Sequence, residues 1–182
     1  MPSMLMSLQQ KKPKIGQGTF LAPTATLIGD VEIGQNCSIW FNAVLRGDVM
    51  PILIGDETNI QDGTIIHGTY NKCGATIGKR VTVGHGVILH GCEIGDRVLI
   101  GMGAIIMDKA KVSNDSFVAA GALITEEKEF PPGVLIVGRP AVVKRELAAD
   151  ELAFLNTSAD NYIFYKKWYE NGSAKIISAE EV

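Results

Sequence analysis

The sequence contains no run of about eighteen consecutive apolar residues, the length that a membrane-spanning helix requires. Residues 1–14, MPSMLMSLQQKKPK, also lack the sustained apolar core of a secretory signal peptide. The formal net charge of -3 at pH 7 leaves no basic excess for binding nucleic acid or an anionic membrane. We therefore expect a cytoplasmic chain with no membrane partner and no nucleic-acid partner.

Cysteine is scarce, because Cys37, Cys73 and Cys92 are the only three, and none belongs to a CxxC pair. An odd number at this spacing argues against a disulfide framework and against a thiolate zinc site. The rest of the composition is ordinary, with 46% hydrophobic and 20% charged residues in 182 positions. One main globular domain with a real core is expected.

What the sequence does contain is an internal repeat, in which an aliphatic residue recurs at six-residue intervals. The series is Leu21, Leu27, Ile33, Ile39, Leu45, Ile54, Ile60, Ile66, Ile77, Val83, Leu89, Ile94, Ile100, Ile106, Val112, Val118 and Ile124. A small residue commonly follows four places later, and both positions are expected to point inward. The spacing breaks after Leu45, Ile66 and Leu89, and corner loops can absorb such length changes. This periodicity predicts a coiled stack of short β-strands.

The motif of aliphatic, Gly, two variable residues and a small residue resembles that of the hexapeptide-repeat proteins. The resemblance implies an all-β solenoid, a left-handed parallel β-helix with about eighteen residues per coil, followed here by a C-terminal α-helix. The left hand comes from the resemblance alone, since parallel crossovers are generally right-handed. We expect an N-terminal arm at 1–14, the β-helix at 15–125, an exit segment at 126–147, the helix at 148–171 and a tail at 172–182.

The expected helix carries an apolar stripe at helical spacing. Its members are Leu152, Leu155, Ala159, Tyr162, Ile163 and Lys166. Asp150 and Glu151 suit the positive end of the helix dipole. A helix that follows a solenoid has to bury such a stripe, either along its own coils or against a neighbouring subunit.

Histidine is as scarce as cysteine, and the repeat aligns two of the three histidines. On successive coils, the residue after the inward aliphatic of one face reads Arg46, His67, His90 and Met107. Adjacent strands lie about 4.8 Å apart, so His67 and His90 are expected to stand one above the other and to share a metal ion. The alternative is that the histidines are exposed turn residues with no joint purpose.

The third histidine, His85, falls in a different column, above Asp62 and near another edge of the coil. Its imidazole is expected to reach the His67 and His90 pair from another copy of the chain, which predicts three metal sites at the interfaces of a symmetric homotrimer. Three imidazoles and an open fourth position are typical of a catalytic zinc site. Because Zn²⁺ lowers the pKa of a bound water to about 7, hydration chemistry becomes available.

Several short motifs together resemble the γ-class carbonic anhydrases, and the resemblance covers nearly the whole chain. They are Arg46-Gly-Asp48, Asn59-Ile-Gln61-Asp62, His67, Gly84-His85-Gly86, His90-Gly91 and Asn161-Tyr162. The resemblance implies a lyase that hydrates CO₂ reversibly to bicarbonate by attack of metal-bound hydroxide. It also implies that His67 and His90 of one subunit and His85 of the next hold Zn²⁺, or alternatively Fe²⁺ or Co²⁺.

The resemblance implies roles for the polar neighbours as well. Arg46 and Asp48 would form an ion pair across the trimer interface, Gln61 would hydrogen-bond the metal-bound water, and Asn59 would help to position the substrate. The repeat itself suggests that Asp62 orients His85 as a hydrogen-bond acceptor. Corner chemistry is the alternative for these residues, since Asp and Asn favour turns.

Tyr162 is expected either to reach the site from the helix or to pack as a buried aromatic residue. The chain departs from the family where a proton shuttle would lie, since Val49 replaces a glutamate and the segment after His67 carries no carboxylate. Tyr70 could stand in, although a phenol is poorly matched to neutral pH. Low activity is expected, and ester or thioester hydrolysis, a hexapeptide acyltransferase and a non-catalytic trimeric assembly subunit remain alternatives.

Overall fold

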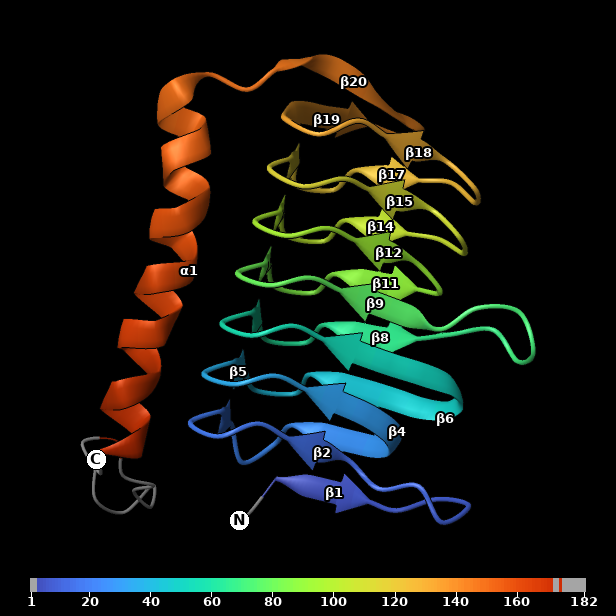
Figure 1. Cartoon of the computed structure of the whole chain (residues 1–182), viewed down its shortest axis with the longest axis vertical. Coiled ribbons are helices and arrows are strands. Elements are labelled where there is room, and N and C mark those ends of the chain that lie inside the picture. The colour runs from blue at the N-terminus through green and yellow to red at the C-terminus, as the bar shows by residue number, and fades with distance from the viewer. Residues whose placement is uncertain (1–2, 172–173, 175–182) are drawn as a thin grey trace, which may run out of the picture.

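The inward positions of the repeat form one continuous apolar column. In the computed structural model, which describes residues 3–171 and residue 174, Ile39, Leu45, Ile60 and Leu89 are fully buried, and the small residues between them are buried too. Short strands separated by tight corners stack into a left-handed parallel β-helix of about seven turns (Figure 1). The predicted fold class is therefore confirmed.

Most coils contribute one short strand to each of three faces. The first face contains β1 (Met4–Met6), β4 (Thr26–Ile33), β6 (Val44–Ile54), β8 (Ile65–His67), β11 (Ile88–His90), β14 (Ile105–Ile106) and β17 (Leu123–Ile124). The second face contains β2 (Lys14–Ile15), β9 (Ala75–Ile77), β12 (Glu93–Ile94), β15 (Lys111–Val112) and β18 (Glu129–Phe130). The long strands β4 and β6 continue from the first face onto the second, because each pairs with strands of both.

The third face is a separate sheet. It contains β3 (Phe20–Leu21), β5 (Ser38–Ile39), β7 (Asn59–Ile60), β10 (Thr82–Val83), β13 (Leu99–Ile100), β16 (Phe117–Val118), β19 (Val134–Gly138) and β20 (Ala141–Glu146). Its strands pair in parallel except for β19 and β20, which are antiparallel.

The parallel ladder extends beyond both expected boundaries. After residue 125, β18 pairs with β15 and β19 pairs with β16, so the coil continues to Gly138. Pro131 and Pro132 do not interrupt the ladder because they lie between β18 and β19, at a corner. In the arm expected at 1–14, β1 adds a parallel strand beside β4. The stack ends where β20 turns back along β19.

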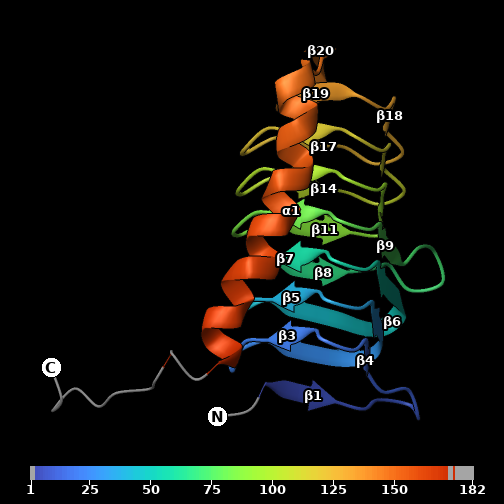
Figure 2. The same cartoon turned by 60° about the vertical axis from the view of Figure 1, so that its left-hand side comes forward.

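Among the described residues there is one helix, α1 (Ala149–Glu170), which lies close to the expected range 148–171 and runs along the solenoid from its last coil to its first (Figures 1 and 2). Leu155, Ser158, Ala159 and Lys166 are its buried residues, and Lys166 donates a hydrogen bond to the carbonyl oxygen of Gly18. Leu155, Ala159 and Lys166 of the expected stripe are therefore buried against the chain's own coils, whereas Tyr162 and Ile163 are only partly buried and Leu152 is exposed. Apart from residue 174, the expected tail at 172–182 lies outside the described residues.

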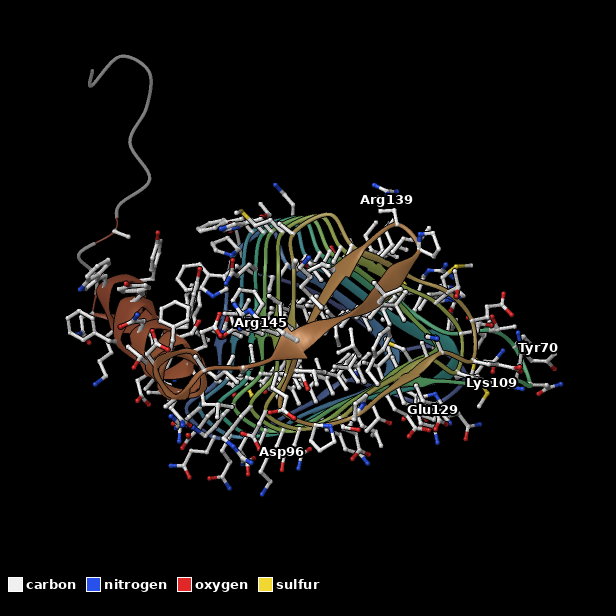
Figure 3. The ribbon with its side chains drawn as sticks, turned by 90° about the horizontal axis from the view of Figure 1, so that it is seen from above. Tyr70, Asp96, Lys109, Glu129, Arg139 and Arg145 are labelled. Carbon is white, nitrogen blue, oxygen red and sulfur yellow. The ribbon has the colours of Figure 1, made fainter. Side chains whose placement is uncertain are left out.

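Viewed along its axis, the coil is filled with side chains, and α1 packs on one side of it (Figure 3). The loop that carries Tyr70, between β8 and β9, projects on the opposite side (Figures 1 and 3). Across the described part of the chain, no helix has the length and apolar character needed to span a membrane. The helix side and the loop side provide the two edges on which the site residues lie.

Candidate metal centre

His67 and His90 end neighbouring strands of the first face, β8 and β11, and the strand register places one directly beside the other. The Nδ1 atom of His67 lies 3.3 Å from the Nε2 atom of His90. Two nitrogens bound to one tetrahedral Zn²⁺ at the usual bond length would lie about 3.3 Å apart. The spacing of these two ring atoms is therefore that of a pair of ligands to one ion.

The other ring nitrogen of each histidine faces a carboxylate. His67 Nε2 lies 2.9 Å from Asp48 Oδ1, and His90 Nδ1 lies 2.6 Å from Asp108 Oδ1. An ionised carboxylate only accepts hydrogen bonds, so each ring donates from that nitrogen and, when neutral, keeps a lone pair on the other. Those two lone pairs face each other across 3.3 Å. Such an arrangement needs a proton or a cation between the rings, and a metal ion fits it.

Asp108, which the sequence analysis did not single out, is 5% exposed. Besides the bond from His90, it accepts hydrogen bonds from Thr69 Oγ1 at 2.7 Å and Lys72 Nζ at 3.0 Å. Burial by itself would raise the pKa of Asp108, but hydrogen bonds from Thr69, His90 and Lys72 outweigh burial and hold the pKa well below its ordinary value. One feature of the sequence could have identified Asp108, because it directly follows Met107, the residue after His90 in the column.

Asp48 holds two groups at once. It accepts from His67 and also forms an ion pair with Arg46 of the same chain. Burial raises the pKa of Asp48, whereas the hydrogen bonds from Arg46 and His67 lower it, and the net shift is downward. Within one chain, Arg46 and Asp48 thus lie beside the histidine pair. Their expected contact across a subunit interface remains a prediction.

His85 lies on the other edge of the coil, just after β10, and its side chain is 50% exposed. Its Nδ1 atom is 2.8 Å from Asp62 Oδ2, which is the contact expected from their shared column. Within the described residues of one chain, no three His, Cys, Asp or Glu side chains are grouped so that they could hold a metal ion. A single chain therefore brings together His67 and His90 but does not add His85 to them.

Two adjacent cavities, of about 430 and 210 Å³, open between α1 and the coil beside His85. His85, Tyr162 and Tyr165 line both of them. Gln61 lines the larger cavity, and its Nε2 donates to Asn59 Oδ1 at 3.1 Å. The expected site residues thus fall into two groups, one around His67 and His90 and one around His85.

Tyr162 lines both cavities, packs edge-on against Trp40 with ring centroids 5.6 Å apart, and is partly buried. Its expected part in the metal site remains a prediction. Burial, with a smaller contribution from the charge of Asp62, raises the pKa of Tyr162 to about 12. The hydroxyl therefore stays protonated at neutral pH and can donate a hydrogen bond. Tyr70, by contrast, is 69% exposed on its loop, away from α1 (Figure 3).

Known proteins resemble this chain over most of its length. Residues 12–47 match the family model described as "Bacterial transferase hexapeptide (six repeats)". Gamma carbonic anhydrases 2 and 1, mitochondrial, of Arabidopsis thaliana are 39% and 43% identical over 98% and 87% of this chain, which spans 66% and 59% of their lengths. A carbonic anhydrase of Geobacillus kaustophilus is 42% identical, and the match covers 92% of this chain and 91% of the length of that protein.

Among solved structures, a hexapeptide transferase family protein from Anaplasma phagocytophilum matches with a TM-score of 0.88. It is 43% identical, and the match covers 91% of this chain and 98% of that one. The solenoid and its flanking helix are therefore shared with a relative of almost equal length. Together with the carbonic anhydrases that align over nearly all of the sequence, this shows that the chain belongs to the γ-class carbonic anhydrase family of hexapeptide-repeat proteins.

Proposed function

We propose that this chain catalyses the reversible hydration of CO₂ to bicarbonate as a homotrimer, with a metal site at each subunit interface. The observation that carries the proposal is the pair of ring nitrogens of His67 and His90, 3.3 Å apart, each ring being oriented by its own carboxylate. In this proposal His67 and His90 of one chain and His85 of a second chain hold the ion, which is Zn²⁺ or alternatively Fe²⁺ or Co²⁺.

A Zn²⁺ ion held there would lower the pKa of a coordinated water to about 7 and so supply a nucleophile at neutral pH. The part played by the chain is to fix the ligands. Asp48 accepts the Nε2 proton of His67, and Asp108 accepts the Nδ1 proton of His90, which leaves the opposite nitrogen of each ring as a lone-pair donor. Removing a hydrogen bond of this kind, made by the ring nitrogen that does not bind the metal, typically lowers the metal affinity about 10–100-fold.

The larger cavity beside His85 has walls of two kinds, which suit the substrate and the product. Leu99, Met102 and Phe117 contribute apolar surface, on which a small apolar molecule such as CO₂ can rest. Gln61 and Tyr162 contribute polar groups that can hydrogen-bond bicarbonate. This division of the lining supports CO₂ and bicarbonate as the ligands.

Slow turnover is part of the proposal, because the chain offers no carboxylate where the family places its proton shuttle. Val49 follows the Arg46 and Asp48 pair, and the loop from Gly68 to Gly74 carries only uncharged residues and Lys72. Transfer of the product proton to water is then left to buffer or to weaker groups.

Stopped-flow measurement of CO₂ hydration tests the proposal on protein loaded anaerobically with Fe²⁺ and aerobically with Zn²⁺ or Co²⁺. We expect a rate above the buffer blank in at least one form and its loss in His85→Ala, together with the bound metal. Hydrolysis of p-nitrophenyl acetate by the same samples separates ester hydrolysis from CO₂ hydration. A metal-loaded protein that never exceeds the blank for CO₂ would overturn the proposal and leave the non-catalytic assembly role.

A further inference from the structure

We propose that Thr82 and Ser158 are positioning residues, which fix the side-chain amide of Gln61 with its oxygen toward the cavity beside His85. A buried row of hydrogen bonds connects the four polar side chains Gln61, Asn59, Thr82 and Ser158, from the coil to α1. All four are at most 7% exposed. The consequence for catalysis rests on the proposed function, whereas the orientation of the amide does not.

The direction of the row is set at a backbone carbonyl. The Nδ2 atom of Asn59 lies 3.3 Å from the carbonyl oxygen of Val81 and 3.0 Å from Thr82 Oγ1. A carbonyl oxygen only accepts hydrogen bonds, so the nitrogen of the Asn59 amide has to face Val81. The oxygen of that amide must then point the other way, toward Gln61.

Asn59 in turn determines the orientation of Gln61. Its Oδ1 is an acceptor, so the group of Gln61 that lies 3.1 Å away has to be the donor, Nε2. The oxygen Oε1 of Gln61 has no hydrogen-bond partner among the described residues. Every buried side-chain oxygen in the described part of the chain has a hydrogen-bond partner, so Oε1 itself cannot be buried. Gln61 Oε1 is therefore open to the cavity that Gln61 lines together with His85 and Tyr162.

Helix α1 completes the row through Ser158. Thr82 Oγ1 accepts from Asn59 and lies 3.0 Å from Ser158 Oγ, so the proton of Thr82 can be donated to the helix. Burying a hydroxyl without a partner is costly, which explains why a serine and not an apolar residue lies on the buried face of α1 opposite Thr82. Without Ser158, the hydroxyl proton of Thr82 could rotate toward Asn59 Nδ2. It would then weaken the hydrogen bond that Asn59 Nδ2 donates to Thr82 Oγ1.

An acceptor at this place in the cavity discriminates between ligands by their protons. Gln61 Oε1 can accept an O–H group, such as that of water or of bicarbonate, but gains nothing from CO₂, which has no proton to donate. Helix α1 therefore does more than cover the third face, because Ser158 supports the row of hydrogen bonds that fixes the polarity of one wall of the cavity.

The test is hydrogen exchange of the Gln61 amide, measured by NMR on metal-free protein labelled with glutamine carrying ¹⁵N in its side chain. Gln61 is the only buried residue among five glutamines, since Gln9, Gln10, Gln17 and Gln35 are exposed. Gln61→Glu identifies its signal by removing it. We expect the Nε2 protons of Gln61 to exchange more slowly than those of the other four.

Thr82→Val and Ser158→Ala should speed this exchange by roughly two- to tenfold, the range expected for one hydrogen bond. Thr82→Ser keeps the hydroxyl and should restore the slow exchange. Thr157→Ala is the matched control on α1, because Thr157 is exposed and its hydroxyl donates only within the helix, to the Ala153 carbonyl oxygen. Unchanged exchange of Gln61 in both Thr82→Val and Ser158→Ala would overturn the inference.

The same variants, loaded with metal, show whether the orientation matters for catalysis. We expect kcat for CO₂ hydration to fall in Thr82→Val and Ser158→Ala while the bound metal stays within the range of Thr157→Ala. Each variant should remain folded at the assay temperature, although the loss of a buried hydrogen bond lowers its Tm. If exchange responds but wild-type protein hydrates no CO₂, the positioning of Gln61 stands and the proposed function fails. If kcat falls without any change in exchange, the inference fails and the function stands.

Discussion

At the scale of single residues, Asp108 is the group on which the orientation of His90 depends. Its carboxylate is buried and accepts from His90, Thr69 and Lys72. Asp108→Asn keeps the size but places an amide where three donors converge. We expect the metal affinity of the protein to fall about 10–100-fold, because the ring of His90 loses its charged acceptor. Competition with a chromophoric chelator measures this affinity.

Asp115→Asn is the control for that substitution. Asp115 also accepts a hydrogen bond from a neighbouring coil, from Arg97 Nε at 2.6 Å, but it touches no histidine. Its replacement should leave the metal affinity unchanged. Equal affinities for the Asp108 and Asp115 variants would contradict the role assigned to Asp108.

Val49 gives a second prediction for a single residue. It follows the Arg46 and Asp48 pair on strand β6 and is partly buried. Val49→Glu adds a carboxylate that can pass a proton to water, so the rate of CO₂ hydration should rise, by at least roughly tenfold at low buffer concentration. The gain should shrink as buffer is added, since buffer then carries the proton. Val49→Gln has the same shape without the titratable group, and an equal gain there would show that proton transfer is not the cause.

The sequence predicts the pairing of His67 with His90 because a fixed repeat determines which residues of successive coils are neighbours. The repeat places Asp108 on the coil next to His90 but does not predict its role, because two of the contacts of that carboxylate depend on the loop that carries Thr69 and Lys72. The conformation of that insertion is not set by the period. Ser158 was missed for a related reason, since the repeat says nothing about how α1 docks on the coil.

At the scale of elements, Glu151 stabilises the N-terminus of α1 through its hydrogen bonds. Its carboxylate accepts from Arg145 at 2.6 and 2.9 Å and from the backbone N–H of Ala148 at 2.9 Å. These bonds lower the pKa of Glu151 from 4.5 to about 2, the bond from Arg145 being the larger cause. A carboxyl group whose pKa is lowered on folding stabilises the folded protein at pH values above the pKa that it has in the unfolded chain. This stabilisation is lost as the pH falls through the lower pKa of the folded protein.

Glu151→Gln should therefore lower the Tm at pH 6, and the difference from wild type should shrink as the pH falls from 4.5 toward 2. Thermal unfolding followed by circular dichroism across this range measures the difference. Asp150→Asn is the control, because Asp150 also lies in the first turn of α1 but makes no such bond among the described residues. A Tm difference that does not vary with pH would contradict the assigned contact.

The boundaries of the elements show how far a repeat can be followed in the sequence. Helix α1 was predicted within one residue at each end, because Asp150 and Glu151 mark its first turn and no proline interrupts residues 149–170. The stripe is a weaker signal, since Leu152 is exposed. The end of the coil was expected at 125, whereas β18 and β19 extend the ladder to Gly138. Pro131 and Pro132 do not end the coil, because they lie at the corner between β18 and β19, where no backbone N–H has to join the ladder.

At the scale of the whole molecule, the two halves of the proposed site lie on different edges of the solenoid. His67 and His90 lie at the ends of β8 and β11, and the loop between β8 and β9 projects away from α1 (Figure 1). His85 follows β10, the strand that α1 packs against through Ser158. A site that needs all three histidines is therefore completed only where one copy of the chain meets another.

Mixing two inactive variants tests this claim most directly. His85→Ala and His67→Ala each break every site of a homotrimer, but a trimer that contains both kinds of chain holds one intact interface. Random assembly of equal amounts should restore about one quarter of the wild-type sites, because about three quarters of the trimers are mixed. We expect bound metal and CO₂ hydration to recover together to that level. If the mixture binds no more metal than either variant alone, the site is not shared between chains and the account is contradicted.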